Sequence, residues 1–192
     1  MGNARMRTPV LYLLIAVNAI VYFGLQQIEW PPLELMPLWP VGKGFESWQL
    51  ITYAFLHGSV LHIGMNMFGL WMFGLDLEED WGSIRFLSYY LFCVVSAGLT
   101  QLAFAAWTGT DAPTVGASGG VFGILLAFAL RYPERRVLLL IPPIPMPARV
   151  FVVLYAAVEL FLGVTGTQAG VAHFAHLGGM LGGLIYLSIV GR

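Results

Sequence analysis

The sequence predicts an all-α, polytopic membrane protein with six spans, and three observations lead to this prediction. The 192 residues are 58% hydrophobic and 10% charged, whereas soluble domains carry roughly a quarter charged residues. The mean hydropathy is +0.79. The basic residues fall almost entirely in alternate breaks between long apolar segments, a pattern typical of polytopic proteins. We therefore expect residues 1–192 to form a single membrane domain with both termini in the cytoplasm.

Six apolar segments are expected to cross a hydrocarbon core about 30 Å thick. They cover residues 9–25, 60–75, 86–107, 115–130, 148–164 and 171–190, and the second and fourth are short. The first segment lacks a small-residue cleavage site, which favours a retained helix over a signal peptide. The breaks are a proline- and glycine-bearing loop over 30–45, an acidic, turn-like stretch over 76–83, and shorter or mixed loops over 108–113, 131–147 and 163–170.

The basic residues determine the expected orientation, because cytoplasmic loops carry an excess of lysine and arginine. With the N-terminus inside, the outer loops hold only Lys43. The inner regions hold every arginine of the chain: Arg5, Arg7, Arg85, Arg131, Arg135, Arg136, Arg149 and Arg192. The second, fourth and sixth segments then all run from the outer face to the inner face, with their polar residues near their starts.

Three polar residues of these segments are expected at a similar depth. His62 lies 14 residues before Asp76, Ser118 lies 13 before Arg131, and His176 lies 16 before Arg192. At 1.5 Å per residue they lie roughly 21, 20 and 24 Å above the inner edge, under 10 Å below the outer face. Tilt blurs each height by several ångströms. A shared polar site near the outer face requires such a coincidence.

Ser118 and His176 are candidates for a nucleophile and its base. A serine hydroxyl needs a base to take its proton, and a neutral imidazole near pH 7 can do so. Glycines follow His176, and Gly179 and Gly183 form a small-xxx-small pair that lets two helices approach closely. We expect these glycines to face Gly119 and Gly123, which brings the hydroxyl to the imidazole. The alternative is generic tight packing, with His176 bonded to a carbonyl.

His62 and Asn66 are four residues apart and lie on one helical face. Both can donate hydrogen bonds to an oxyanion, as can the first amides of the helix that begins at Ser118. The alternative is a pair that satisfies itself in a helix interface. His57 either supports this group or is a solvated loop residue, and His173 either supports His176 or merely shares its face.

The remaining polar and aromatic residues have less certain roles. Phe122, one turn from Ser118, either packs against His176 or is ordinary core. Glu159 lies roughly 15 Å up from Arg149 and is expected to be protonated or paired inward, with no partner that the sequence identifies. The acidic run 78–80 is expected to be a solvated inner loop. Tryptophans are expected to anchor the outer interface: Trp30, Trp39, Trp48 and Trp107.

Taken together, these residues resemble the rhomboid intramembrane serine proteases over nearly the whole chain, from about Pro9 to Val190. Three motifs carry the resemblance, in the family's order. They are His57-x4-His62-x3-Asn66, Gly116-Ala117-Ser118-Gly119, and Ala175-His176-Leu177-Gly178-Gly179 continuing to Gly183.

The resemblance implies a role for each matching residue. Ser118 would be the nucleophile and His176 the base, as a dyad without a carboxylate. His62, Asn66 and the Ser118 amide would form the oxyanion hole, and Phe122 stands where the family often has a tyrosine on the histidine. Supporting roles would fall to His57, Gly116, Gly179 and Gly183.

The resemblance also implies what surrounds the site. The loop over 30–45 would lie partly in the membrane, and the fifth segment with the 163–170 loop would form a mobile gate and cap. One departure concerns Trp48-Gln49, where the family often has Trp-Arg. That position supports the first loop, so the departure puts loop stability in question rather than chemistry.

The implied function is cleavage of single-span membrane proteins within the lipid bilayer, with no cofactor, no metal and no nucleic acid. We expect a bacterial inner membrane, with the site facing the extracytoplasmic side. Two other classes stay open. The four histidines could form an intramembrane metal site. A transporter or a binder of membrane helices would explain Glu159 but leave the matched depths of Ser118 and His176 unexplained. Substrate and oligomeric state are open.

Overall fold

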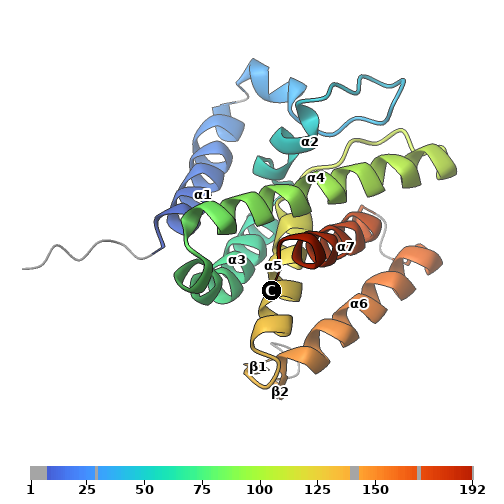
Figure 1. Cartoon of the computed structure of the whole chain (residues 1–192). Helices are drawn as coiled ribbons and strands as arrows, with labels where there is room; N and C mark the ends of the chain where they lie inside the picture. Colours follow the sequence, from blue (N-terminus) through green and yellow to red (C-terminus); the bar gives the residue numbers. More distant parts are fainter. Residues whose placement is uncertain (1–7, 29, 139–142, 168–169, 192) are drawn as a thin grey trace, which may run out of the picture.

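The computed structural model describes residues 8–28, 30–138, 143–167 and 170–191. Seven α-helices make up most of this part of the chain (Figure 1). Their bounds are α1 Pro9–Ala19, α2 Gln49–Thr52, α3 Val60–Trp81, α4 Ser83–Thr108, α5 Ser118–Arg131, α6 Ala148–Thr165 and α7 His173–Val190. The π-helical turn η1 (Ile20–Leu25) and the 3-10 turn η2 (Gln26–Ile28) extend α1, while the 3-10 turns η3 (Pro31–Leu35) and η4 (Tyr53–Phe55) lie beside α2. The strands β1 (Arg136–Leu138) and β2 (Pro145–Pro147) pair antiparallel between α5 and α6.

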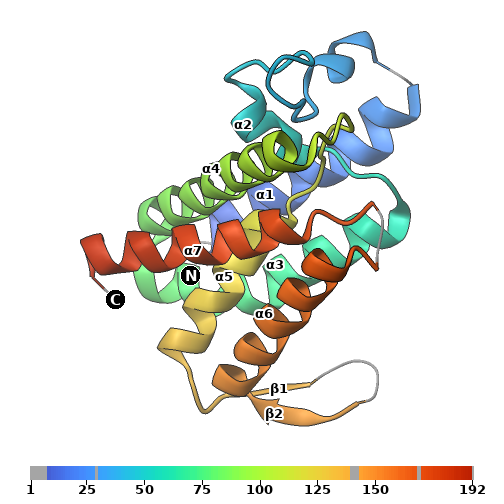
Figure 2. The ribbon, with the colours of Figure 1, turned by 90° about the vertical axis from the view of Figure 1, so that its right-hand side faces the viewer.

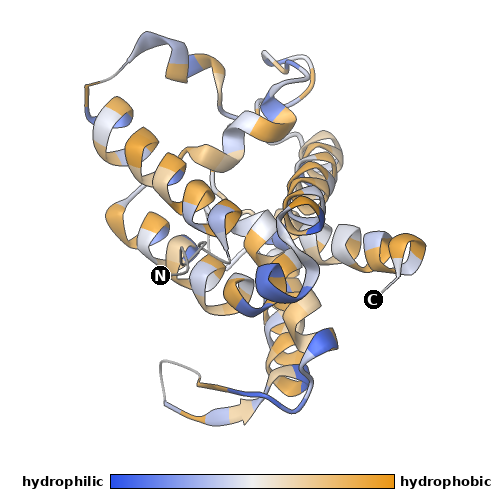
Figure 3. Cartoon of the chain, turned by 60° about the vertical axis from the view of Figure 1, so that its left-hand side comes forward, coloured by the Kyte–Doolittle hydropathy of each residue, from blue (hydrophilic) through white to orange (hydrophobic). Residues whose placement is uncertain are grey.

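The fold class predicted from the sequence is confirmed: the chain is an all-α, multi-pass membrane bundle. Five helical stretches are long and apolar enough to cross a membrane, namely α1 with its extensions, α3, α4, α6 and α7. The sixth, α5, is apolar but shorter. Figure 3 shows hydrophobic residues along all the long helices. The prediction of a single domain over the whole sequence stays a prediction.

The short helix α5 lies at the centre of the bundle, where α3, α4, α6 and α7 pack around it (Figures 1 and 2). Nine of its 14 residues are buried. A helix that its neighbours enclose does not need to reach both membrane faces, which explains why the fourth apolar segment is short. Its first residue, Ser118, is thereby placed inside the ring of helices rather than against lipid.

Glycines let α5 approach its neighbours closely, as predicted for the contact between α5 and α7. A Cβ on Gly179 would overlap the backbone of Gly119, so α5 and α7 meet there nearly backbone to backbone. Gly123 faces the same glycine of α7, because a Cβ on Gly123 would lie 3.1 Å from the Gly179 carbonyl oxygen. A Cβ on Gly183 would instead collide with the hydroxyl of Tyr89 on α4, which donates a 2.7 Å hydrogen bond to the carbonyl of Gly123. Gly179 thus faces both glycines of α5, while Gly183 makes room for the tyrosine that bonds the Gly123 carbonyl.

Charged contacts distinguish the two ends of the bundle. At the end where α3 and α5 finish, Arg131 bonds Asp80 at 2.6 Å and Arg135 bonds Asp76 at 3.0 Å. The arginine that follows the start of α4, Arg85, bonds the carbonyl of Gly191 at the end of α7. The arginine-rich end is the expected cytoplasmic face. The starts of α3, α5 and α7 therefore share the opposite end, as predicted, while the orientation in a membrane stays a prediction.

The acidic stretch over 76–83 is helical rather than turn-like, which corrects the sequence analysis. Helix α3 continues to Trp81, and the chain turns only at Gly82, whose φ is +78°. A positive φ of this size is strained for residues with a Cβ, so the single glycine makes a tight corner into α4 possible. The predicted second span over residues 60–75 is thus too short at its inner end.

Glu78 is buried, whereas the sequence analysis expected a solvated loop. Its carboxylate accepts the backbone N–H groups of Val10 at 3.0 Å and Leu11 at 2.6 Å, together with the hydroxyl of Ser83 at 2.6 Å. These two amides belong to the first turn of α1, which has no intrahelical acceptors for them. The negative charge also complements the positive end of the helix. Glu78 therefore caps α1 from another helix.

The first loop is held by the residue that departs from the family pattern. Gln49 is 2% exposed. Its side-chain oxygen accepts the amides of Trp39 at 3.1 Å and Glu46 at 3.2 Å, and its nitrogen donates to the carbonyls of Gly44 at 3.1 Å and Leu35 at 3.3 Å. A neutral amide thus satisfies both donors and acceptors of the loop, so the departure leaves the loop well anchored.

Candidate active site

The turn before α5 places the Ser118 hydroxyl beside α3 and α7. Gly116 has a φ of +129°, and its N–H donates to the carbonyl of Tyr53 at 3.0 Å. A Cβ on Gly116 would come within 2.8 Å of the His62 imidazole. Both the backbone conformation and the lack of space require glycine there. Ser118 follows as the first residue of α5 and stays partly exposed.

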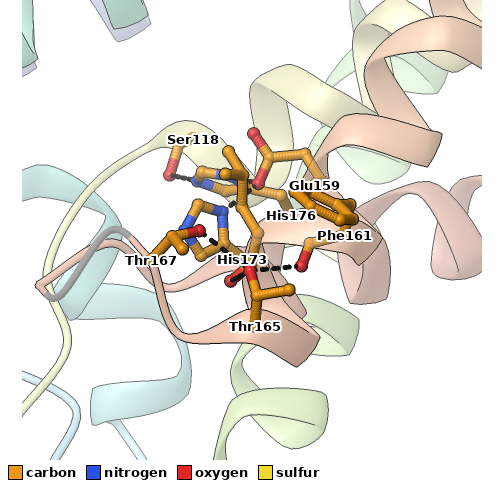
Figure 4. Close-up of polar contacts among 8 residues, drawn as sticks. Ser118, Glu159, Phe161, Thr165, Thr167, His173 and His176 are labelled. Carbon is orange, nitrogen blue, oxygen red and sulfur yellow. Dashed lines mark hydrogen bonds and ion pairs between the residues drawn. The ribbon is translucent and has the colours of Figure 1, made fainter.

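The predicted contact between Ser118 and His176 is present. His176 lies in the first turn of α7, and its Nε2 is 2.8 Å from the Ser118 Oγ (Figure 4). Phe122 stacks on the face of the imidazole, with ring centroids 4.3 Å apart and an interplanar angle of 6°. Of the two interpretations of Phe122, the structure favours the one in which it packs against His176. The ring is thus fixed by a hydroxyl at its edge and a phenyl group on its face.

A carboxylate reaches the other nitrogen of His176, contrary to the expectation of a dyad alone. The Glu159 Oε2 on α6 lies 2.9 Å from the His176 Nδ1 and 2.6 Å from the His173 Nδ1 (Figure 4). All three side chains are buried. The missing partner of Glu159 is therefore the pair of histidines on α7, and His173 shares more than a helical face with His176.

The sequence contained one signal for this contact that the depth estimate obscured. His173 and His176 are three residues apart, so their rings can bind a common group. Counting along straight helices separated Glu159 from His176 by roughly 9 Å in height. The 2.9 Å contact shows that the count overestimates the separation, since the count ignores helix tilt and the length of the two side chains. When a sequence has an acid within a membrane span and two histidines three residues apart on another span, a contact between them should be considered even if the estimated depths differ.

His62 and Asn66 lie on the α3 side of Ser118. The Asn66 amide donates to the His62 carbonyl at 2.9 Å, so the two side chains do not satisfy each other directly. The His62 Nδ1 accepts the N–H of Gly58 at 3.4 Å. This bond favours the tautomer with hydrogen on Nε2, the atom that borders Gly116. An imidazole N–H is thereby available beside the serine.

His57 is buried against His62 rather than facing solvent. It is 1% exposed, and its ring meets the His62 ring edge to face, with centroids 5.0 Å apart. Its backbone exchanges hydrogen bonds with the Gln26 side chain, at 3.0 and 3.1 Å. Burial, together with the nearby charge of His62, lowers the pKa of His57 to about 4. His57 is therefore neutral near pH 7.

One group of side chains within the described ranges has the composition of a metal site. The ligand atoms of Glu159, His173 and His176 all lie within 4.8 Å of one another. Two imidazoles and a carboxylate are a known zinc ligand set. The separations of 2.6 and 2.9 Å are those of hydrogen bonds. His57 and His62 do not belong to this group, so the four-histidine metal site expected as an alternative is not assembled.

Comparisons with known proteins agree with the resemblance. The family model described as the rhomboid domain matches residues 44–192. The mitochondrial Rhomboid protein 1 of Saccharomyces cerevisiae is 31% identical over 188 residues, which is 92% of this chain and 52% of the yeast protein. RHOMBOID-like protein 4 of Arabidopsis thaliana is 35% identical over 145 residues, 76% of this chain and 34% of the plant protein.

A bacterial relative is also similar. The Rhomboid protease GluP of Bacillus subtilis is 26% identical over 187 residues, which is 94% of this chain and 34% of that protein. The chain therefore spans a third to a half of the length of these three relatives. Because the family model covers well over half of the sequence, the chain belongs to the rhomboid family.

Proposed function

We propose that the chain is an intramembrane serine protease that hydrolyses peptide bonds in or near the transmembrane segment of single-span membrane proteins. The observation that carries this proposal is the 2.8 Å contact between Ser118 Oγ and His176 Nε2. The contact lies at the end of the bundle opposite the arginine cluster, and Ser118 is partly exposed there. Polar groups within a membrane are costly and indicate a functional site.

In the proposed reaction, Ser118 attacks the carbonyl carbon of a substrate segment that has lost its helical hydrogen bonds. The Oγ–C bond forms as the hydroxyl proton moves to His176 Nε2 and the carbonyl oxygen becomes negative. The imidazolium then gives the proton to the amide nitrogen as the C–N bond breaks. Water, deprotonated by the same imidazole, hydrolyses the acyl-enzyme and restores the serine.

Three donors are proposed to stabilise the oxyanion. The His62 Nε2–H borders the serine, and Asn66 has a second amide hydrogen besides the one donated to the His62 carbonyl. The backbone N–H of Ser118 belongs to the first turn of α5, where amides have no intrahelical partner and the helix end is positive. Fixed donors of this kind are effective because they need no reorganisation as charge develops.

The location and orientation of the protein are also part of the proposal. We propose the bacterial inner membrane, with the site facing the extracytoplasmic side, and one of the similar proteins is bacterial. The yeast relative is named as mitochondrial. Fractionation of the source cells and protease protection of tags at the two termini would settle the compartment and the orientation.

The test is cleavage of a single-span substrate by reconstituted protein. We expect wild type and Ser118→Ala to differ completely, with Ser118→Ala inactive but folded. Ser188→Ala is the matched control, because Ser188 lies near the other end of α7 and is exposed. A serine-directed phosphonate should label wild type and Ser188→Ala only, and a chelator should have no effect. Cleavage by Ser118→Ala at the wild-type rate would refute the proposal.

A further inference from the structure

We propose that Glu159 is a positioning residue for the catalytic base, so that Ser118, His176 and Glu159 act as a triad with His173 as its anchor. This inference rests on the proposed protease function. It changes the dyad implied by the family resemblance into an arrangement whose third member is carried by α6. The observations behind it are four side-chain groups linked in one chain of contacts, with the hydroxyl at one end.

The contacts determine which nitrogen of His176 carries the hydrogen. Glu159 Oε2 is a carboxylate oxygen, which only accepts hydrogen bonds when ionised. At 2.9 Å it therefore selects the tautomer with hydrogen on the His176 Nδ1. The Nε2 lone pair is then directed at the Ser118 hydroxyl, 2.8 Å away. Only this tautomer can accept the serine proton.

His173 keeps the carboxylate in place. Its Nδ1 lies 2.6 Å from the same Oε2, so one oxygen accepts two imidazole N–H groups. A buried carboxylate without such donors would be strongly destabilised. The two bonds fix the oxygen between the rings, because the histidines lie three residues apart within the first turn of α7. His173 thus acts through Glu159 rather than on the substrate.

The carboxylate also stabilises the charge that forms on the base. When the serine proton arrives at Nε2, His176 becomes an imidazolium with a negative group at its other nitrogen. The attraction is strong because the group is buried. No proton passes to Glu159 in this step. The other titratable groups nearby are His62 on α3 and Tyr155, one turn earlier on α6, and neither bonds the carboxylate in the described part of the chain.

The first test is the pH profile of cleavage by Glu159→Gln. We expect kcat to fall roughly 100-fold, with KM changed by less than threefold, because a neutral amide neither selects the tautomer nor stabilises the imidazolium. The acid limb of kcat/KM should move to lower pH, since the base loses the charge that favours its protonation. Glu159→Asp should recover part of kcat. Leu160→Ala, an exposed neighbour on α6, is the control and should match wild type.

Two results would overturn the proposal. One is Ser118-dependent cleavage by Glu159→Gln within threefold of wild type and with an unchanged acid limb. The other is loss of wild-type activity with a chelator and its return with zinc, which would make the cluster a metal site. Neither result is the same as failure of the protease proposal, which is measured separately by cleavage with Ser118→Ala.

A second measurement covers the case in which Glu159→Gln does not fold. Nitrogen-15 NMR of histidine-labelled wild-type protein reports the tautomer of each ring directly, with His176→Asn used for assignment. We expect His176 to carry its hydrogen on Nδ1, with the strongly deshielded proton of a carboxylate-bonded imidazole. Hydrogen on Nε2 would overturn the proposal. His173→Asn should reduce kcat about tenfold while leaving the tautomer unchanged.

Discussion

Two buried glutamates of this protein differ in their hydrogen-bond partners, and the partners indicate whether each acid has a structural role or a role at the candidate site. Glu78, at the arginine-rich end, accepts two backbone amides and a hydroxyl, none of which titrates near neutral pH. Among the described residues, the partners of Glu159, at the other end, are the two imidazoles of His173 and His176. The first arrangement holds a helix in place. The second connects through His176 to the Ser118 hydroxyl, so its partner is a ring that can gain a proton. The partners, rather than burial, distinguish them.

The largest expected effect is a loss of stability when Glu78 is replaced, and it tests whether the two glutamates have different roles. Glu78→Gln should lower the free energy of unfolding by about 3 kcal/mol, because charge-assisted bonds to α1 are lost and an amide N–H₂ faces other donors. Activity per folded molecule should stay unchanged. Thermal unfolding in detergent and active-site titration measure the two quantities. Glu79→Gln, the exposed neighbouring acid, is the control. A fall in kcat larger than the fall in folded fraction would show that the two glutamates are not distinct.

The second prediction concerns the contact between α5 and α7 that holds Ser118 beside His176, at the same end of the bundle as Glu159. Gly179→Ala would place a Cβ on the Gly119 carbonyl, so α5 and α7 must separate. We expect a loss of about 2 kcal/mol in stability, together with reduced phosphonate labelling of Ser118, because the hydroxyl and imidazole move apart. Gly64→Ala is the control, since that position has open space. Equal labelling of the two variants would contradict the proposed role of the close approach.

The third prediction concerns the first loop, which is distant from both glutamates. Gln49→Ala should cost about 1–2 kcal/mol, because four loop groups lose their partner at a buried position. Gln27→Ala, at an exposed position with one bond to the Tyr22 carbonyl, should cost less. Limited proteolysis of the loop measures the difference. Indistinguishable rates for the two variants would show that Gln49 does not anchor the loop.

At neutral pH the smallest expected effect is that of His57, because its contribution changes only as the pH falls. Its pKa of about 4 in the folded protein is below its ordinary value, so the unfolded chain binds the proton more readily. The contribution to stability is present above about pH 6.5 and declines as pH falls from there toward 4. His57→Asn should therefore lose less stability than wild type between pH 7 and pH 4.5, measured by thermal unfolding. Parallel profiles of the two proteins would contradict this.

The fold and the central contact were accessible from the sequence because they depend on patterns along one chain. Apolar segment lengths and arginine placement predicted the spans, and the shared depth of Ser118 and His176 predicted their meeting. The partners of Glu78 and Glu159 were missed for a common reason. Both acids bond groups on other helices, and the distance between helices depends on tilt and on where each helix ends. The acidic run after Asp76 looked like solvated turn because charge density alone does not reveal buried acceptors.

The place of Glu159 on α6 has a mechanical consequence. Helices α5 and α7 are in close contact through facing glycines. Helix α6 is the least enclosed of the long helices, because 22% of its residues are buried, against 50% of the residues of α7. A displacement of α6 that lengthens the 2.9 Å contact between Glu159 and His176 would detach the acid from the imidazole while leaving the serine and histidine together. In the proposed protease, an outward displacement of α6 would therefore open the bundle on that side and, in the same movement, remove the carboxylate that makes His176 a stronger base.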